Sequence, residues 1–131
     1  MTMFRIYIWM DGQKFDADNF QSCLGASLKG SVEVRKRMNN GVVEQYGKYW
    51  SSEVQEIAFD RPEEEVTKLL RRYEFEIRRA KASNATRIVA EIVAEYDTVD
   101  DVRGFYFSTE LIRLLAELGV SIDIDIVRRL S

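Results

Sequence analysis

Asn40-Gly41 is the strongest local structural signal in the chain, because it separates two stretches of alternating side chains, residues 31–39 and 42–50. A two-residue β-turn needs positive φ at both central residues, which asparagine and glycine adopt at little cost. With Asn39 facing Val42, the predicted cross-strand pairs are Met38–Val43, Arg37–Glu44, Arg35–Tyr46, Glu33–Lys48 and Val32–Tyr49. Most of these pairs join opposite charges or apolar side chains, which stabilises one register. We therefore predict a β-hairpin over residues 31–50.

The closing segment LIRLLAELGVSIDIDIV predicts a helix followed directly by a strand. Ser108 is a favourable N-cap, and Gly119 suits the turn that ends the helix. In the strand, residues 120–127, isoleucines alternate with Asp123 and Asp125, so the two carboxylates point to the same side. We interpret that side as solvent-exposed, because metal binding or acid-base catalysis needs further groups that the sequence does not identify.

The remaining periodicities complete an α+β fold. We expect the other elements to be strands at 4–10, 51–59, 86–96 and 105–107, a short helix at 16–25 and a long helix at 60–82. The element order is then β-α-β-β-β-α-β-β-α-β, with three helices packed on a mixed, mostly antiparallel sheet. A chain of 131 residues can bury one core, which predicts a single domain, residues 1–131.

Composition excludes several kinds of function. The chain has no histidine, which removes Ser-His-Asp catalysis and imidazole-bound zinc. A net charge of -3 disfavours nucleic acid as a partner, and no apolar run is long enough to cross a membrane. The single cysteine, Cys23, lies among apolar residues of the short helix, where we expect it to be buried. We find no signal peptide and predict a cytoplasmic protein without cofactor, metal or catalytic residue.

Aromatic and basic side chains form the candidate partner-binding surface. Tyr7 and Trp9 share one face of the first strand, and Arg35 and Tyr46 share one face of the hairpin. Trp50 follows the hairpin closely in the sequence. Tryptophan, tyrosine and arginine are enriched at protein interfaces, which favours a binding surface if these side chains are exposed. The alternative is that helices cover this face and the rings fill the core.

The whole pattern resembles a bacterial family of domains of unknown function, family 4279 (DUF4279). The resemblance rests on the opening strand, the short helix DADNFQSCLG, the LKG that follows it, Trp50 after the hairpin, a long leucine-bearing helix and the closing LIRLLAELGVSIDIDIV. It extends over nearly the full length of the chain. It implies a compact α+β bacterial protein and supplies no catalytic residues.

These observations together predict a non-catalytic binding protein. Analogy with other small bacterial proteins suggests an immunity protein, which neutralises a toxin by protein-protein contact. Acidic side chains would then steer a basic partner by charge, namely Asp123, Asp125, Glu91 and Glu95.

Two other interpretations stay open at this point. The first is a small-molecule- or metal-binding domain, enzymatic through carboxylates, with Asp97, Asp100 or Asp101 near a pocket. The second concerns assembly: the protein is either a monomer or a homodimer that forms through the strand face of Tyr7 and Trp9.

Overall fold

The computed structural model describes residues 2–57, 61–97 and 104–128, in which six strands form one sheet. The elements are β1 (Thr2–Asp11), α1 (Ala17–Ser22), β2 (Gly30–Asn39), β3 (Val42–Ser52), β4 (Gln55–Ile57), α2 (Pro62–Arg72), α3 (Glu74–Ala82), β5 (Arg87–Tyr96), α4 (Thr109–Leu118) and β6 (Ser121–Arg128). The strand order is β2-β3-β1-β5-β6, and β4 also pairs with β1. The β5–β6 pair is parallel and the others are antiparallel. This confirms the predicted α+β fold with a mixed, mostly antiparallel sheet.

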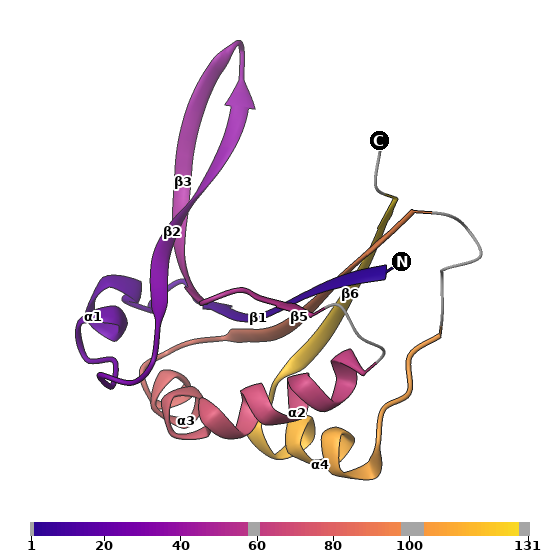
Figure 1. Cartoon of the computed structure of the whole chain (residues 1–131). Helices are drawn as coiled ribbons and strands as arrows, with labels where there is room; N and C mark the ends of the chain where they lie inside the picture. Colours follow the sequence, from indigo (N-terminus) through magenta and orange to yellow (C-terminus); the bar gives the residue numbers. More distant parts are fainter. Residues whose placement is uncertain (1, 58–60, 98–103, 129–131) are drawn as a thin grey trace.

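The helices α2, α3 and α4 lie together on one side of the sheet (Figure 1). Alternate residues of β1 and β5 point into that layer, as strand geometry requires. The core side chains from these two strands are Phe4, Ile6, Ile8, Met10, Ile88, Ala90, Ile92 and Ala94. The opposite side of β1, β5 and β6, called the open face below, carries no helix in the part of the chain that is described (Figure 1). The fold therefore leaves one polar sheet surface accessible.

Two elements differ from the sequence-based expectation. The predicted long helix is divided at Tyr73, where φ is -102° and ψ is 11°, so the described residues contain four helices instead of three. The Tyr73 ring is buried, and its hydroxyl donates to the carbonyl of Lys29 at 2.8 Å. The predicted strand at 105–107 is wrong, because this segment pairs with no strand of residues 2–57, 61–97 and 104–128. Phe105 and Phe107 pack against the core instead.

The turn of the β2–β3 hairpin is confirmed. Asn40 and Gly41 adopt φ values of 51° and 79°, as the turn type requires. The first pairs beyond the turn are the predicted ones, Asn39–Val42, Met38–Val43 and Arg37–Glu44. The hairpin rises from the sheet on the side away from α2, α3 and α4 (Figure 1).

A β-bulge changes the register of this hairpin nearer the sheet. Lys36 pairs with Gln45, but Arg35 pairs with Gly47, which leaves Tyr46 without an opposite residue. The predicted pairs on the far side of the bulge are therefore wrong by one residue, and the observed ones are Arg35–Gly47, Val34–Lys48, Glu33–Tyr49 and Val32–Trp50. An extra residue on one strand increases local twist and reverses which side chains face each side of that strand.

Local signals mark the starts of α1, α2 and α4, and the N-cap of α4 is Ser108, as predicted. Asp16 and Ser108 accept hydrogen bonds from the backbone N–H groups of Asn19 and Leu111. Pro62 begins α2, where it loses no hydrogen bond. None of the described helices is long and apolar enough to cross a membrane.

Gly119 ends α4 with φ 66° and ψ 38°, and Gly119→Ala is expected to lower the free energy of unfolding by about 1–2 kcal/mol. An added Cβ is disfavoured in this left-handed conformation and would also collide with the side chain of Lys81. Urea denaturation measures the loss. Gly104→Ala is the control, because its Cβ would enter open space. Equal losses in the two variants would contradict the assignment of the strain to Gly119.

Candidate functional site

The open face aligns polar and aromatic residues of β1, β5 and β6 in rows that cross the sheet. The pairing of these strands places three rows next to one another, Arg5–Val93–Asp125, Tyr7–Glu91–Asp123 and Trp9–Val89–Ser121. Neighbouring residues in a row lie on adjacent strands about 5 Å apart, close enough for their side chains to interact. The parallel pairing of β5 with β6 is therefore what brings Glu91 beside the two aspartates.

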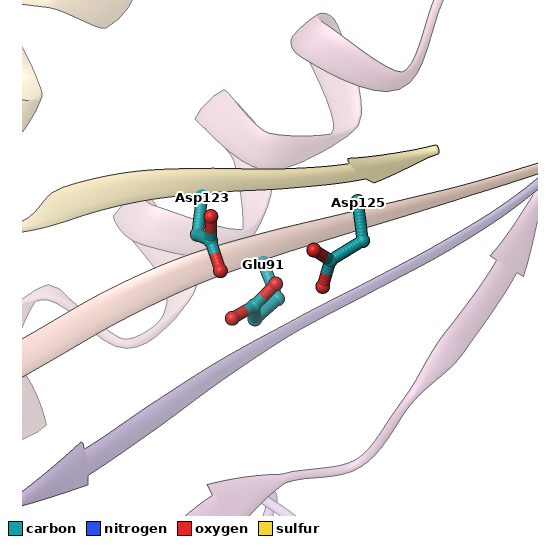
Figure 2. A group of neighbouring side chains, drawn as sticks. All are labelled: Glu91, Asp123 and Asp125. Atoms are coloured by element: carbon teal, nitrogen blue, oxygen red, sulfur yellow. The ribbon is translucent and has the colours of Figure 1, made fainter. Parts of the chain in front are cut away.

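Three carboxylates converge in the middle of the open face (Figure 2). Glu91 comes from β5, and Asp123 and Asp125 come from β6; we call these residues the acidic cluster. One carboxylate oxygen from each residue lies within 4.8 Å of the other two. Glu91 is only 6% exposed, whereas both aspartates are exposed. The cluster thus contains one buried carboxylate, Glu91, and two carboxylates that are accessible to solvent.

The Glu91 carboxylate is held from one side. Nε1–H of Trp9 donates to Glu91 Oε1 at 3.0 Å. Oε2 is buried and has no hydrogen-bond partner within the described residues. Burial raises the pKa of Glu91, the Trp9 hydrogen bond lowers it, and the proximity of Asp123 raises it further, so the pKa reaches about 7. The site therefore holds an unfavourable buried charge at neutral pH unless a proton or another cation compensates it.

Tyr7 lies next to Glu91 in the same row of the sheet. Burial raises the pKa of its phenol, and the charge of Glu91 raises it further, so Tyr7 stays protonated at neutral pH. Its hydroxyl is consequently available as a hydrogen-bond donor beside the acidic cluster.

A second cluster of charged side chains, formed by Asp11, Arg35 and Arg87, lies at one end of the open face. The carboxylate of Asp11 accepts hydrogen bonds from Arg35 at 2.6 Å and from Arg87 at 2.6 and 3.0 Å. Burial favours a higher pKa for Asp11, but the two guanidinium groups outweigh it and hold the pKa below its ordinary value. Both guanidinium groups stack over the Trp9 ring, 5.2 and 5.1 Å from its centroid. These contacts fix the arginines in place.

Most predicted partner-binding residues are brought together on this side of the molecule. Tyr7, Trp9, Asp123 and Asp125 lie on the open face. Arg35 reaches it from β2 through its ion pair with Asp11 and its contacts with the rings of Trp9 and Tyr49. Tyr46 lies apart on the projecting hairpin, more than half exposed, under the guanidinium group of Arg37.

Trp50 does not belong to this surface. Its side chain is fully buried among the core residues, where its ring packs edge-on against Phe20 and its Nε1–H donates to Gln21. Trp50 and Tyr49 are neighbours in β3, so their side chains point to opposite sides, and it is the Tyr49 ring that contacts Trp9 of the open face. The prediction that Trp50 contributes to a partner surface is therefore wrong.

Two other sequence-based predictions have different outcomes. Cys23 is exposed at the end of α1 and not buried as expected, because the helix ends one residue before it. Of the loop acids considered as ligands, Asp100 and Asp101 lie outside the described residues, and Asp97 is exposed at the end of β5. Within the described residues, Asp97 joins no group of possible metal ligands.

Asp11 and Arg87 are site residues that the sequence did not indicate. Asp11 is the last residue of β1 and Arg87 is the first residue of β5. Because the two strands are antiparallel, these residues face each other. A signal for them exists, since both are charged residues at strand ends, but pairing them requires the strand order.

A hollow of about 870 Å³ lies on the helical side, lined by residues of α2, the start of α4 and the segment before it. Its charged groups pair with one another, as in the ion pairs Arg61–Glu64 and Arg71–Glu110. The backbone N–H of Tyr106 donates to Glu63. With its polar groups satisfied internally, this hollow is a weaker candidate than the open face.

Comparison with known proteins identifies the family of the chain but gives no function. No curated protein and no solved structure matches it. The model of the family described as "Domain of unknown function (DUF4279)" matches residues 2–128, and so nearly the entire chain. This match confirms the resemblance seen in the opening strand, the short helix and the closing helix-Gly-strand segment. The chain therefore belongs to the DUF4279 family.

Proposed function

We propose that this chain is a protein-binding domain that contacts its partner through the projecting β2–β3 hairpin and the open face. The observation that carries the proposal is the set of large apolar side chains exposed on the hairpin. Met38, Val42, Val43 and Tyr46 are each more than half exposed. Large apolar groups gathered on one projecting element are typical of interaction surfaces.

The hairpin is built as an arm. Beyond the bulge its two strands pair with each other, while β3 pairs with β1 at Trp9–Ser51 and Met10–Trp50. An isolated two-stranded hairpin is only marginally stable in water, so the apolar side chains at its end gain little from folding alone. A partner that covers Met38 and Val43 would bury a cross-strand apolar pair and stabilise the arm.

The open face supplies ordered anchors next to this arm. Arg35 lies 4.6 Å from the centroid of the Tyr49 ring and 5.2 Å from that of Trp9. Side chains that are already held in one conformation lose less entropy on binding, which favours affinity. The acidic cluster in the same surface attracts basic side chains, so the proposal favours a partner with a basic contact surface.

The more specific proposal is an immunity protein that acts in the cytoplasm and neutralises a toxin by covering it. The support is chemical: the chain has no histidine and a net charge of -3, and a toxin that acts on nucleic acid presents the complementary basic surface. No bond-making step is needed for such inhibition, since contact alone excludes the substrate.

The test compares two exposed apolar positions on opposite sides of the molecule. Val43 on the hairpin is 57% exposed and Ile112 on α4 is 56% exposed. The product of the neighbouring gene is the first partner to test, followed by proteins that co-purify from the native host, with each affinity measured by isothermal titration calorimetry. Val43→Lys is expected to weaken binding about tenfold or more, and Ile112→Lys about twofold or less.

The toxin-neutralising proposal has its own assay. Cells that express the candidate toxin should grow when the wild-type chain or Ile112→Lys is co-expressed, and should not grow with Val43→Lys. Equal weakening by the two substitutions would contradict docking through the hairpin. Tight binding to a partner without any protection would contradict the immunity role and leave the binding proposal intact.

A further inference from the structure

Glu91 presents a feature that the proposed partner binding does not explain. The residue is only 6% exposed, and its Oε2 atom has no hydrogen-bond partner among the described residues. A buried carboxylate oxygen without a partner is costly, and such groups in folded proteins usually have a water, an ion or a proton beside them. The neighbouring groups are two more carboxylates, which cannot donate a hydrogen bond while ionised. A proton or a metal cation between these oxygens would remove that cost.

We propose that the acidic cluster of Glu91, Asp123 and Asp125 is a binding site for a hard divalent cation, with Ca²⁺ as the preferred ion. Carboxylate oxygens are the ligands that Ca²⁺ and Mg²⁺ select in proteins. The three side chains supply one oxygen each, and water completes the coordination shell on the open side. The inference does not depend on the proposed function, because it concerns the free chain and the ion alone.

The spacing of the cluster places the three carboxylates within reach of one Ca²⁺ ion. Oxygens of the three residues lie within 4.8 Å of one another. Ca²⁺ binds oxygen at about 2.3–2.6 Å, so two of its ligands can be separated by at most about 4.6–5.2 Å. Mg²⁺ binds at about 2.0–2.1 Å and demands near-octahedral geometry, which two exposed aspartates satisfy less easily than the flexible shell of Ca²⁺.

The surroundings leave the negative charge of the cluster available to an ion. No lysine or arginine of the described ranges forms an ion pair with Glu91, Asp123 or Asp125. Arg5 lies in the same row as Asp125, but it forms an ion pair with Glu95 instead. At the far end of the face, Arg35 and Arg87 are bonded to Asp11. These three guanidinium groups are therefore already paired with other carboxylates.

Trp9 acts as a positioning residue for this site. Its indole N–H bonds one oxygen of Glu91 and so fixes the orientation of the carboxylate, with the second oxygen left for the ion. Outer hydrogen bonds of this kind orient metal ligands and tune their affinity. Trp9 also provides a spectroscopic reporter that touches a proposed ligand directly.

The experiment follows the indole N–H resonances of metal-free ¹⁵N-labelled protein during titration with CaCl₂ or MgCl₂. The chain has two tryptophans, and each indole N–H donates to a side-chain oxygen: Trp9 to Glu91 and Trp50 to Gln21. Ca²⁺ should shift the Trp9 resonance in a saturable way, with a Kd of about 0.1–1 mM, as for weak sites with few protein ligands. The Trp50 resonance should not move.

The variants separate a built site from loose counterions. Asp123→Asn changes an exposed side chain and should weaken Ca²⁺ binding about tenfold or more. Glu91→Gln should do the same, and Glu117→Gln on the exposed side of α4 should leave it unchanged. The proposal is overturned if the Trp9 resonance stays in place up to about 10 mM Ca²⁺ and Mg²⁺. It is also overturned if Asp123→Asn responds like the wild type, or if both indole resonances move together.

Discussion

Trp50→Ala is expected to lower the free energy of unfolding by about 3–5 kcal/mol, the range for removing a buried large aromatic side chain. The Trp50 side chain is fully buried and lies between the rings of Phe20 and Tyr73, with centroid distances of 4.9 and 5.8 Å. It joins β3 to α1 and to the break between α2 and α3, so its loss opens a cavity where three elements meet. Urea denaturation followed by circular dichroism measures the change.

The surroundings of Trp50 cannot close over that cavity easily. Gly30 lies so close to the indole ring that a Cβ at this position would collide with it. The backbone has therefore already approached the ring as far as glycine permits, and further collapse would have to distort β2. Large residual cavities are what place a substitution at the upper end of the expected range.

Trp9→Ala is the matched control, because it removes the same side chain from the open face. Trp9 is half-buried, and its main contacts are the stacked guanidinium groups and the hydrogen bond to Glu91. At a partly exposed site a cation–π contact contributes about 0.5–1 kcal/mol and a hydrogen bond about 0.5–1.5 kcal/mol, so these three contacts together amount to about 1.5–3.5 kcal/mol, which is less than the loss expected at Trp50. A loss at Trp9 that equals the loss at Trp50 would contradict the assignment of the two rings to different faces.

The features that could be predicted from the sequence are those fixed by a few neighbouring residues. The turn at Asn40-Gly41, the cap at Ser108 and the left-handed residue Gly119 depend on local backbone chemistry, and each lies where it was expected. The core side chains of β1 and β5 occupy alternate positions along each strand, a pattern that is visible in the sequence itself. Such signals require no knowledge of which strands become neighbours.

The features that could not be predicted depend on an inserted residue or on strand order. The bulge at Tyr46 shifts the pairing of everything beyond it. Gly47, the next residue, is a local signal, because an isolated glycine inside a strand is typical of a bulge, but it does not determine which residue is left unpaired. Residues 105–107 have the composition of a strand, but Phe105 and Phe107 are used to cover the core.

The acidic cluster shows the same limit. Asp123 and Asp125 were expected to face one side of a strand, and they do. What the sequence could not supply is their neighbour, because β5 and β6 are separated by α4 and pair in parallel through this crossover. Only that pairing sets Glu91 directly opposite Asp123 and turns an exposed pair of acids into a cluster with a buried member.

We expect the free energy of unfolding to fall as the pH rises from about 4.5 to about 7, because Glu91 is buried. The pKa of Glu91 is raised from 4.5 to about 7 in the folded chain. Below 4.5 the residue is protonated in both the folded and the unfolded state, and its contribution to stability is fully present. As the pH rises through the window, the unfolded chain releases its proton first and binds fewer protons than the folded chain, so the free energy of unfolding decreases.

The size of this effect follows from the shift. One pKa unit corresponds to about 1.4 kcal/mol, so a full shift of this size would give about 3 kcal/mol. The two aspartates that face Glu91 are exposed and screened by water, which reduces the expected loss to about 1–2 kcal/mol between pH 4.5 and pH 8. Tyr7, the other titratable group beside Glu91, stays neutral throughout because its pKa is raised above 10.

Glu91→Gln isolates this contribution from the other carboxylates of the chain. Glutamine keeps the acceptor for Trp9 and offers an N–H₂ group to Asp123, but carries no charge. In metal-free buffer the variant should exceed the wild type in unfolding free energy by about 1–2 kcal/mol at pH 8 and equal it near pH 4.5. Glu117→Gln should show no such pH-dependent difference. A constant difference between Glu91→Gln and the wild type from pH 4.5 to pH 8 would mean that Glu91 ionises in its ordinary range, and that neither a proton nor a cation is needed in the middle of the open face.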